Sequence, residues 1–456
     1  MRSETAYALI DGNNFYVSCE RVFNPRLHDR PVVVLSNNDG CIIARSNEAK
    51  ALGIRMGQPW FEVRPTAARL GLVALSSNYA LYADMSARLM RVLAAFAPRQ
   101  EIYSIDECFL DMSGIPAPER LRLAQELRAR AARWLGLPVG VGLGPSKTLA
   151  KLANHRAKRL PELDGVCDLS GPAPAMLDAH LASVAIGDVW GVGRRLAPRL
   201  EALGIHSALD LRQTNPARLR ERFSVTLART VNELRGQSCL AIEDVPALQQ
   251  QIVNSRSFGQ PVNDPTALRE ALTQFTSRAA EKLRRQRACA GLVGVHLRLR
   301  TGPGREGLRD LQAALPLPRP SSDTRVLLRA ALALLTRLYP SGASCVKAGI
   351  LLGELSAPSA MTADLFTDRP QTERDARLMQ TLDAINTRLG RDSLRLASEG
   401  PSGPRPWHGQ QTRRSPRYTT HPDELPRAQA NASAFSTIQA APWQQLYLQN
   451  EGFPDN

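Results

Sequence analysis

Acidic residues stand at the ends of two predicted strands. Asp11 directly follows the apolar run Tyr7–Ile10, and Asp106 and Glu107 are adjacent in the bend of a predicted hairpin. If these strands pair, three carboxylates converge, and a fold carries that repulsion only when a cation lies between them. Oxygen ligands favour Mg²⁺, and two such ions can serve an in-line phosphoryl transfer. Taken singly, each acidic group is typical of a solvated turn or a cap, so the metal interpretation depends on both occurring together with the motifs around them.

The elements that must position these acids are predicted to be mixed strands and helices. Short β-like runs alternate with helical patterns over the first 170 residues. Apolar residues recur every four positions over 78–96, which predicts a helix, and a strand over Pro138–Gly144 precedes a further helix that begins near Ser146. Strands and helices return over 252–355, followed by one helix over 372–389. The last 50 or so residues are predicted to be a tail that adds nothing to a core.

The net charge points to a polyanionic partner. Lys and Arg number 58 against 43 Asp and Glu, a net charge of +15. Residues 251–350 alone hold 16 basic and 6 acidic residues, so this segment supplies +10 of that excess. Cations gather at Lys282–Arg287, and Arg298 and Arg300 alternate along a predicted strand. A surface that grips DNA explains this localisation better than a uniform arginine bias does.

Cysteine usage and hydropathy bear on the compartment. The seven cysteines lie far apart and include no C-x-x-C pair, so the sequence suggests neither a disulfide framework nor a zinc site. The first ten residues lack the pattern of a signal peptide, and no run of 18 apolar residues occurs. We expect a cytoplasmic protein that does not enter the membrane.

Several longer motifs carry a family resemblance. Together they resemble the Y-family DNA polymerases, and most closely the UmuC branch, the catalytic subunit of the bacterial mutagenic translesion polymerase. The motifs are DGNNFYVSCE, VVVLSNNDGCIIARSNEAKALGIRMG, SSNYALYADMS, EIYSIDECFLDMSG, VGVGLGPSKTLAKLANHRAK, DVWGVGRR, NSRSFG and SPRYTT.

The resemblance implies an α+β right-hand polymerase with a separate DNA-gripping domain. Its parts are a palm over 1–170 with small fingers inserted at about 36–77, a helix–hairpin–helix thumb over 171–238, a tether over 239–251, a little finger over 252–355 and a C-terminal tail over 356–456.

The resemblance also assigns the catalytic acids and the sugar gate. Asp11, Asp106 and Glu107 are the implied ligands of two Mg²⁺ ions, and the carbonyl of Gly12 is able to add another. Asp111, on the next strand, matches a family acid that need not touch metal. Tyr16 stands at the position of the steric gate, where an aromatic ring excludes a ribose hydroxyl. The local pattern alone would make Tyr16 a core aromatic beside Phe15.

Further residues are implied to contact the nucleotide and the DNA. Ile42 and Ile43 stand where the fingers cover the nascent base pair, and small aliphatic side chains there would shape a loosely closed pocket of low fidelity. Without the family, the basic helix that contains Lys158 would be a solvated face. The implied nucleotide contacts are Phe15, Ile42, Arg45, Lys50 and Lys158, and the implied DNA contacts are Gly191, Gly193, Arg256, Arg298 and Arg300.

The predicted activity is low-fidelity translesion DNA synthesis in the SOS response. The expected partners are primer-template DNA, deoxynucleotides, a processed UmuD dimer and RecA. A sliding clamp is a further candidate, because Leu365 and Phe366 match the Leu-Phe pair of the clamp-binding peptide, although Thr362 replaces its glutamine. Two alternatives stay open at this point, a palm-type nucleotidyl cyclase and a DNA-binding repair module without catalysis.

Overall fold

The computed structural model describes residues 5–171, 174–243, 249–304, 307–358, 369–390, 392–401, 403, 405 and 407–426. The chain divides into two compact units, residues 1–415 and 416–456. Within the described parts, no helix is both long enough and apolar enough to span a membrane. Leu365 and Phe366, the predicted clamp contacts, lie outside the described residues.

A five-stranded sheet carries the predicted acids. Its order is β5-β6-β1-β7-β8, and β1 lies between two antiparallel partners. Residues on both faces of β1 are buried, as expected for a strand covered on each side. The strands are β1 (Tyr7–Gly12), β5 (Gln100–Ile102), β6 (Glu107–Asp111), β7 (Val139–Gly144) and β8 (Val166–Asp168), and the accompanying helices are α1 (Phe15–Phe23), α4 (Tyr79–Leu93), α5 (Ala117–Leu135) and α6 (Lys147–Arg159).

Glycines in β7 let helix α6 approach the sheet closely. A Cβ atom on Gly142 would overlap the carbonyl oxygen of Ala150 and the backbone nitrogen of Asn154. The Asn154 side chain donates to the carbonyl of Gly140 at 2.8 Å and so ties α6 to the same strand. The PVGVGLG run therefore sets the distance between the sheet and the helix that carries three lysines.

A three-stranded sheet is inserted between β1 and β5 in the sequence, and a helical cluster follows β8. The smaller sheet has the order β3-β2-β4 and its own apolar core around Val33, Ile42 and Trp60. The helical cluster packs its core against Leu149 and Leu152 of α6. The elements are β2 (Val32–Leu35), β3 (Ile42–Arg45), α2 (Asn47–Ala51), α3 (Trp60–Ala67), β4 (Val73–Ser76), and then α7 (Pro174–Ala182), α8 (Ala197–Glu201), α9 (Ala208–Gln213), α10 (Pro216–Arg222) and α11 (Val225–Leu234).

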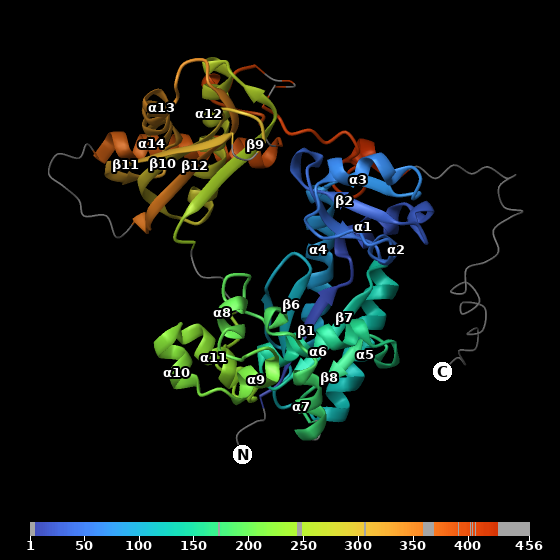
Figure 1. Ribbon diagram of the computed structural model, residues 1–456. Coiled ribbons are helices and arrows are strands. Elements are labelled where there is room, and N and C mark those ends of the chain that lie inside the picture. The colour runs from blue at the N-terminus through green and yellow to red at the C-terminus, as the bar shows by residue number, and fades with distance from the viewer. Residues whose placement is uncertain are drawn as a thin grey trace, which may run out of the picture. The chain divides into compact units, whose positions relative to one another are not determined.

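A four-stranded antiparallel sheet follows, in the order β11-β10-β12-β9. Figure 1 shows α12 and α13 together on one face of it, and their apolar stripes form the core. The elements are β9 (Ile252–Val262), α12 (Pro265–Arg285), β10 (Cys289–Arg300), β11 (Leu308–Ser321), α13 (Thr324–Leu338) and β12 (Ser344–Ser356). The sequence did not predict β11, because its prolines disguise a strand. As an edge strand, it can hold them without losing ladder bonds.

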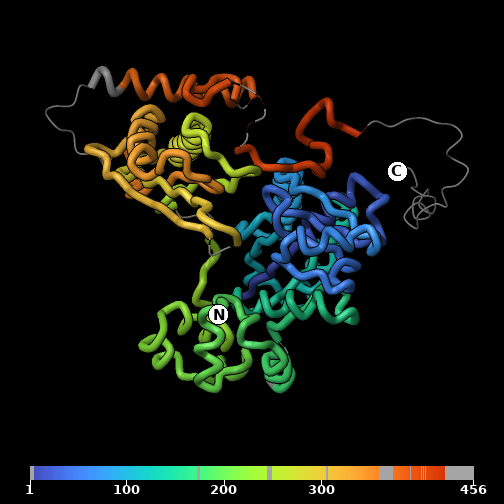
Figure 2. Tube along the Cα trace, turned by 45° about the horizontal axis from the view of Figure 1, so that its top comes forward, coloured from blue at the N-terminus to red at the C-terminus, as the bar shows by residue number. Residues whose placement is uncertain are grey.

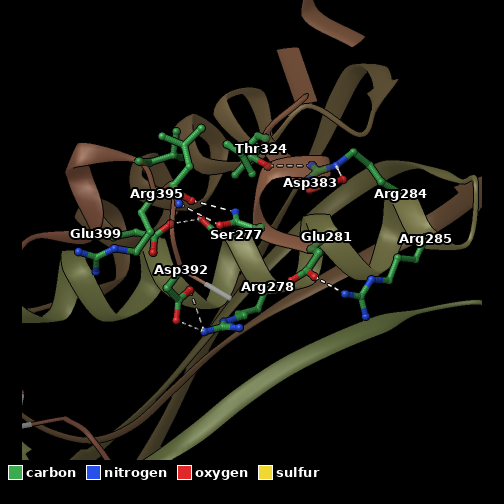
Figure 3. A pocket seen from close by; sticks show the side chains of 14 residues that line it. Ser277, Arg278, Glu281, Arg284, Arg285, Thr324, Asp383, Asp392, Arg395 and Glu399 are labelled. Carbon is green, nitrogen blue, oxygen red and sulfur yellow. Dashed lines mark hydrogen bonds and ion pairs between the residues drawn. The ribbon is translucent and has the colours of Figure 1, made fainter. Parts of the chain in front are cut away.

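Helix α14 (Arg369–Arg388) and the segment after it lie beside this layer (Figure 2). Figure 3 shows the contacts: Arg284 forms two 2.7 Å bonds with Asp383, and Arg278 binds Asp392 at 2.8 Å. The Ser277 hydroxyl donates to Glu399 at 2.7 Å. Part of the arginine cluster that the sequence assigned to a DNA-gripping surface is therefore engaged in holding α14.

The prediction that the last 50 residues add nothing to a core was wrong. The Trp407 side chain is 1% exposed and joins the core of the four-stranded sheet, where its ring meets that of Phe275 edge to face. Ser415 is also buried. Short polar stretches without periodicity gave no sign of this packing, because their partners lie more than 100 positions away in the sequence. In the second unit, Arg417 binds Glu424 beside a short 3₁₀ turn, Pro422–Glu424.

Substituting Gly142 with alanine tests the close approach of α6. We expect the free energy of unfolding to fall by about 3 kcal/mol, because the added methyl group overlaps backbone atoms that cannot move independently. Urea denaturation measures the effect. Gly171→Ala is the matched control, since no atom lies within 4 Å of its Cβ position. Equal stability of the two variants would contradict this account of the packing.

Candidate active site

The paired strands bring the predicted acids together. Asp11 and Glu107 are direct cross-strand partners at one end of the sheet, and the Asp106 carbonyl accepts a 2.9 Å bond from the Gly12 backbone. The sequence left this pairing as a condition, and the structure shows that the two strands do pair. Asp111 lies at the opposite end of β6, where it pairs with Tyr7.

Ser104 shapes the turn that presents Asp106 and Glu107. Its hydroxyl donates to Asp106 Oδ1 at 2.8 Å and accepts from the backbone nitrogens of Asp106 at 3.3 Å and Glu107 at 3.0 Å. This serine was not among the residues predicted from the sequence. A serine two residues before an aspartate, in a turn between strands, was the available signal.

Two lysines of α6 form ion pairs with Asp11 and Glu107. Lys158 Nζ is 2.6 Å from Asp11 Oδ1, and Lys151 Nζ is 3.1 Å from Glu107 Oε2. In the part of the chain that the structure describes, no three carboxylate, histidine or cysteine side chains form a group that could hold a metal ion. The acids therefore converge along the backbone as predicted, but the lysines provide their nearest positive charges.

Burial and mutual repulsion act on the acids together. Burial raises the pKa of Asp11, Lys158 opposes that shift, and Glu107 reinforces it. Burial likewise raises the pKa of Asp106, where the Ser104 hydroxyl opposes the shift and Asp11 reinforces it. Both carboxyl groups thus bind protons more readily than ordinary aspartates do, as expected where like charges gather away from water.

An aromatic group encloses Lys151. Its ammonium lies 4.4 Å from the centre of the Tyr103 ring and 5.3 Å from that of Trp190. The Trp190 indole donates to the Tyr103 hydroxyl at 3.1 Å. These contacts fix Lys151 beside Glu107. They could not be predicted from the sequence, because Lys151, Tyr103 and Trp190 come from separate segments.

A second basic group gathers near Asp11. Burial lowers the pKa of Lys50, and the positive charges of Arg45 and Lys158 lower it further, while Asp11 opposes the shift. Arg45 donates to the carbonyl of Ile54 at 2.7 Å, and its Nε atom is buried with no hydrogen-bond partner in the described structure. Three cations, one each from β3, α2 and α6, therefore act on one another at this end of the sheet.

Tyr16 lies on the first turn of α1 beside two further tyrosines. Its ring stacks on that of Tyr82 with centroids 4.5 Å apart and planes at 16°, and it meets Tyr79 edge to face at 6.0 Å. Burial raises the pKa of Tyr16 to about 12, and Tyr79 and Asp106 act in the same direction. Tyr16 is only half-buried.

Two residues predicted to contact the nucleotide are buried in the protein. The Phe15 side chain is 3% exposed and Ile42 is 0% exposed. Ile42 packs in the core of the three-stranded sheet, because alternate residues of a strand point to opposite faces. Its neighbour Ile43 is the half-buried one, on the same face as Arg45.

The predicted DNA contacts have different surroundings. Gly191 lies between the 3₁₀ turn Ile186–Asp188 and α8, and its φ of +89° favours glycine there. Gly193 has no positive φ. Arg298 forms bonds of 2.7 and 2.8 Å with Asp310 on the neighbouring strand, so its charge is largely balanced. Arg256 and Arg300 are exposed.

Comparison with solved structures gives the class of the fold. A Y-family DNA polymerase chimera, Dbh-Dpo4(243-245)-Dbh, superposes with a TM-score of 0.61 at 20% identity, over 77% of this chain and 99% of that one. An insertion ternary complex of Dbh DNA polymerase gives 0.53, also at 20% identity, over the same shares of the two chains. The fold is that of the Y-family DNA polymerases.

Sequence comparisons narrow the class. Residues 10–155 match the impB/mucB/samB family, residues 249–365 match its C-terminal domain, and residues 376–428 match a domain of unknown function (DUF4113). UmuC of Salmonella typhimurium is 43% identical over 92% of this chain and 99% of its own length, and ImpB of Salmonella typhimurium is 42% identical over the same shares. DNA polymerase IV of Pelotomaculum thermopropionicum is 29% identical over 87% of the chain and 96% of its own length. The chain belongs to the impB/mucB/samB family, in the UmuC branch of the Y-family polymerases.

Replacing Ser104 with alanine tests its role in shaping the acidic turn. The change removes a hydroxyl that donates one hydrogen bond and accepts two. We therefore expect the free energy of unfolding to fall by about 1–2 kcal/mol. Chemical denaturation measures the loss. Ser104→Thr keeps the hydroxyl and should recover most of it. If the threonine variant is as unstable as the alanine variant, the hydroxyl does not support the turn.

Proposed function

We propose that this chain is a template-directed translesion DNA polymerase, which transfers deoxynucleotides to a primer opposite damaged template bases. The observation that carries the proposal is the cross-strand pair of Asp11 and Glu107, with Asp106 beside it, at one end of the central sheet. This arrangement occurs in a chain that belongs to the UmuC branch of a polymerase family. The named activity of relatives such as DNA polymerase IV supports the same conclusion.

We assign the parts of a right hand to the elements described above. The five-stranded sheet is the palm, the three-stranded sheet the fingers, the helical cluster the thumb and the four-stranded sheet the little finger. In β10, His296, Arg298 and Arg300 share the face opposite the core residues Val295, Leu297 and Leu299. That helix-free face is where we place the DNA, with Arg300 as its less restrained cation. Arg256, predicted as a further DNA contact, is the register partner of the core residue Ala348 and so lies on the face that α12 covers.

The donor set fits a pair of Mg²⁺ ions. The side chains of Asp11, Asp106 and Glu107 offer only oxygen ligands, which suits a hard divalent cation. Gly12 lies among them, and a Cβ atom there would approach the Phe15 ring to 3.0 Å and Asp106 Cβ to 3.5 Å. The three carboxylates form no ready-made metal cluster in the described residues, so we propose that they and the Gly12 carbonyl would hold the ions once Lys158 has left Asp11. When bound, the ions would polarise the primer hydroxyl and neutralise charge on the phosphates.

The reaction that this site would perform is an in-line displacement. The 3′-oxygen of the primer forms a bond to the α-phosphorus, the bond from that phosphorus to the bridging oxygen breaks, and pyrophosphate leaves while the hydroxyl proton is lost. Arg45, Lys50 and Lys158 gather near Asp11, where they can neutralise the triphosphate. In this assignment, Lys158 exchanges its bond with Asp11 for one with a phosphate oxygen.

Tyr16 is our candidate for the residue that selects the sugar. Its ring is held by Tyr79 and Tyr82, and the charge of Asp106 acts on its hydroxyl. A rigid aromatic ring beside the catalytic acids can fill the space that a 2′-hydroxyl would need. Ile43, on the face opposite the fingers core, takes over from Ile42 as the aliphatic residue that shapes an open, low-fidelity base-pair pocket.

The family also suggests the setting in which the enzyme works. We propose that it acts in the cytoplasm during the SOS response to DNA damage, together with a processed UmuD dimer and RecA. The likeness to UmuC supports these partners.

Replacing Asp106 with asparagine tests the polymerase assignment. The change keeps the shape of the side chain but removes a charged ligand, so primer extension with Mg²⁺ should fall at least about 1,000-fold. Extension on an undamaged template and on one with an abasic site, in the presence of the accessory proteins, measures it. Asp111→Asn is the matched control at the far end of β6 and should retain activity. Equal extension by the wild type and Asp106→Asn would refute the assignment.

Replacing Tyr16 with alanine tests the sugar gate. Loss of the ring opens space next to the sugar, so the preference for deoxynucleotides over ribonucleotides should fall by about 100-fold, with deoxynucleotide insertion largely kept. Single-nucleotide insertion kinetics with each substrate measure the ratio of kcat/KM values. Tyr16→Phe keeps the ring and should discriminate as the wild type does. An unchanged ratio in Tyr16→Ala would show that Tyr16 is only a packing residue.

A further inference from the structure

A segment near the C-terminus packs against the fingers and the palm. We name residues 410–415 the strap. Arg414 forms a parallel bridge with Ser76, the last residue of the edge strand β4, and the Ser76 backbone nitrogen donates to the Arg413 carbonyl at 3.0 Å. The Thr412 backbone nitrogen donates to Asp39 Oδ2 at 3.2 Å. The strap thus extends the three-stranded sheet by one short stretch of chain.

The strap ends in a buried polar network. Ser415 donates from its hydroxyl to Glu20 Oε1 at 2.9 Å, and Tyr82 donates to the same oxygen at 2.7 Å. Asn78 donates from its side chain to the Ser415 hydroxyl at 2.9 Å and to its carbonyl at 3.1 Å. All four residues are at most 9% exposed, so each bond forms away from water, where it has the most effect on position.

This network joins the two helices that hold Tyr16. Glu20 lies one turn after Tyr16 on α1, and Tyr82 lies one turn into α4, which Asn78 caps by accepting from the Leu81 backbone nitrogen. The Tyr82 ring, whose hydroxyl is fixed by Glu20, is the one that stacks on Tyr16 at 4.5 Å. The hydrogen bonds of Ser415 therefore connect it to the contact between α1 and α4, at the place where the rings of Tyr16 and Tyr82 stack.

We propose that Ser415 of the strap is a positioning residue for sugar selection, acting through Glu20 and Tyr82 on the orientation of the Tyr16 ring. The inference rests on the proposed role of Tyr16 as the steric gate. It assigns a function to part of the segment that matches a domain of unknown function, since that match covers residues 376–428. Ser415 itself does not touch the nucleotide.

The chemistry of the network predicts how it fails. Without the Ser415 hydroxyl, the buried Glu20 carboxylate keeps Tyr82 as its side-chain donor and Asn78 loses an acceptor, so α1 and α4 are held less firmly. Tyr82→Phe removes the other bond to Glu20 and leaves the stacked ring in place. Because both changes act through the same carboxylate, their effects should not add.

The experiment compares ribonucleotide and deoxynucleotide insertion by Ser415→Ala, Tyr82→Phe and the double variant. We expect the ratio of kcat/KM values to shift about five- to tenfold toward ribonucleotides in each single variant, the range expected for one hydrogen bond. The double variant should shift no further than the larger single effect. Ser415→Thr keeps the hydroxyl and should restore the discrimination of the wild type.

Thr412→Ala is the matched control, because it removes a side-chain bond from the same strap to Asp39, away from Glu20. It should leave the ratio unchanged, and thermal denaturation should find all variants folded at the assay temperature. An equal shift in Thr412→Ala, or additive shifts in the double variant, would overturn the inference in favour of general loosening.

Tyr16→Ala, measured in parallel, separates the two levels of the proposal. If it admits ribonucleotides and Ser415→Ala does not, the gate is correct and the role of the strap is refuted. If Tyr16→Ala leaves the ratio unchanged, the gate assignment fails and the inference about Ser415 falls with it.

Discussion

The antiparallel pairing of β1 with β6 is the constraint on which the rest of the site depends. It sets Asp11 opposite Glu107 and brings Asp106 next to Gly12, so three acidic side chains share one end of a buried sheet. Such a pairing is unfavourable by itself, because burial and mutual repulsion both penalise the charged forms. The lysines of α6 offset that cost, and they reach the acids only because glycines in β7 let the helix approach the sheet so closely.

Two helices, α1 and α4, form the surroundings of the acids on the side of Tyr16. Helix α1 begins shortly after β1 and carries Tyr16 on its first turn, while α4 supplies the two rings that contact it. The position of Tyr16 therefore depends on the contact between two helices. In this molecule a buried carboxylate, Glu20, and a serine almost 400 positions later in the chain bridge that contact.

Charge in the C-terminal half illustrates why composition is a limited guide. The excess of basic residues over 251–350 is real, yet Arg284 holds α14 through Asp383, and Arg298 is matched by Asp310. Counting residues cannot distinguish a cation that faces a phosphate from one that joins two elements. On the face of the sheet without helices, Arg300 is exposed, whereas Arg256 lies on the face that α12 covers.

The sequence by itself determined the strands and helices with strong periodicity and the family, and it singled out Asp11, Asp106 and Glu107 as candidate acids, because local patterns and contiguous motifs encode all three. It could not place Ile42 in the fingers core, since which face of a short strand is buried depends on what packs against it. Nor could it show that Trp407 and Ser415 are buried, or that Lys151 lies among Tyr103 and Trp190. Those contacts join residues far apart in the chain, so only the tertiary structure decides them. The free energy of a buried polar or aromatic contact depends on both partners together and cannot be assigned to either residue alone.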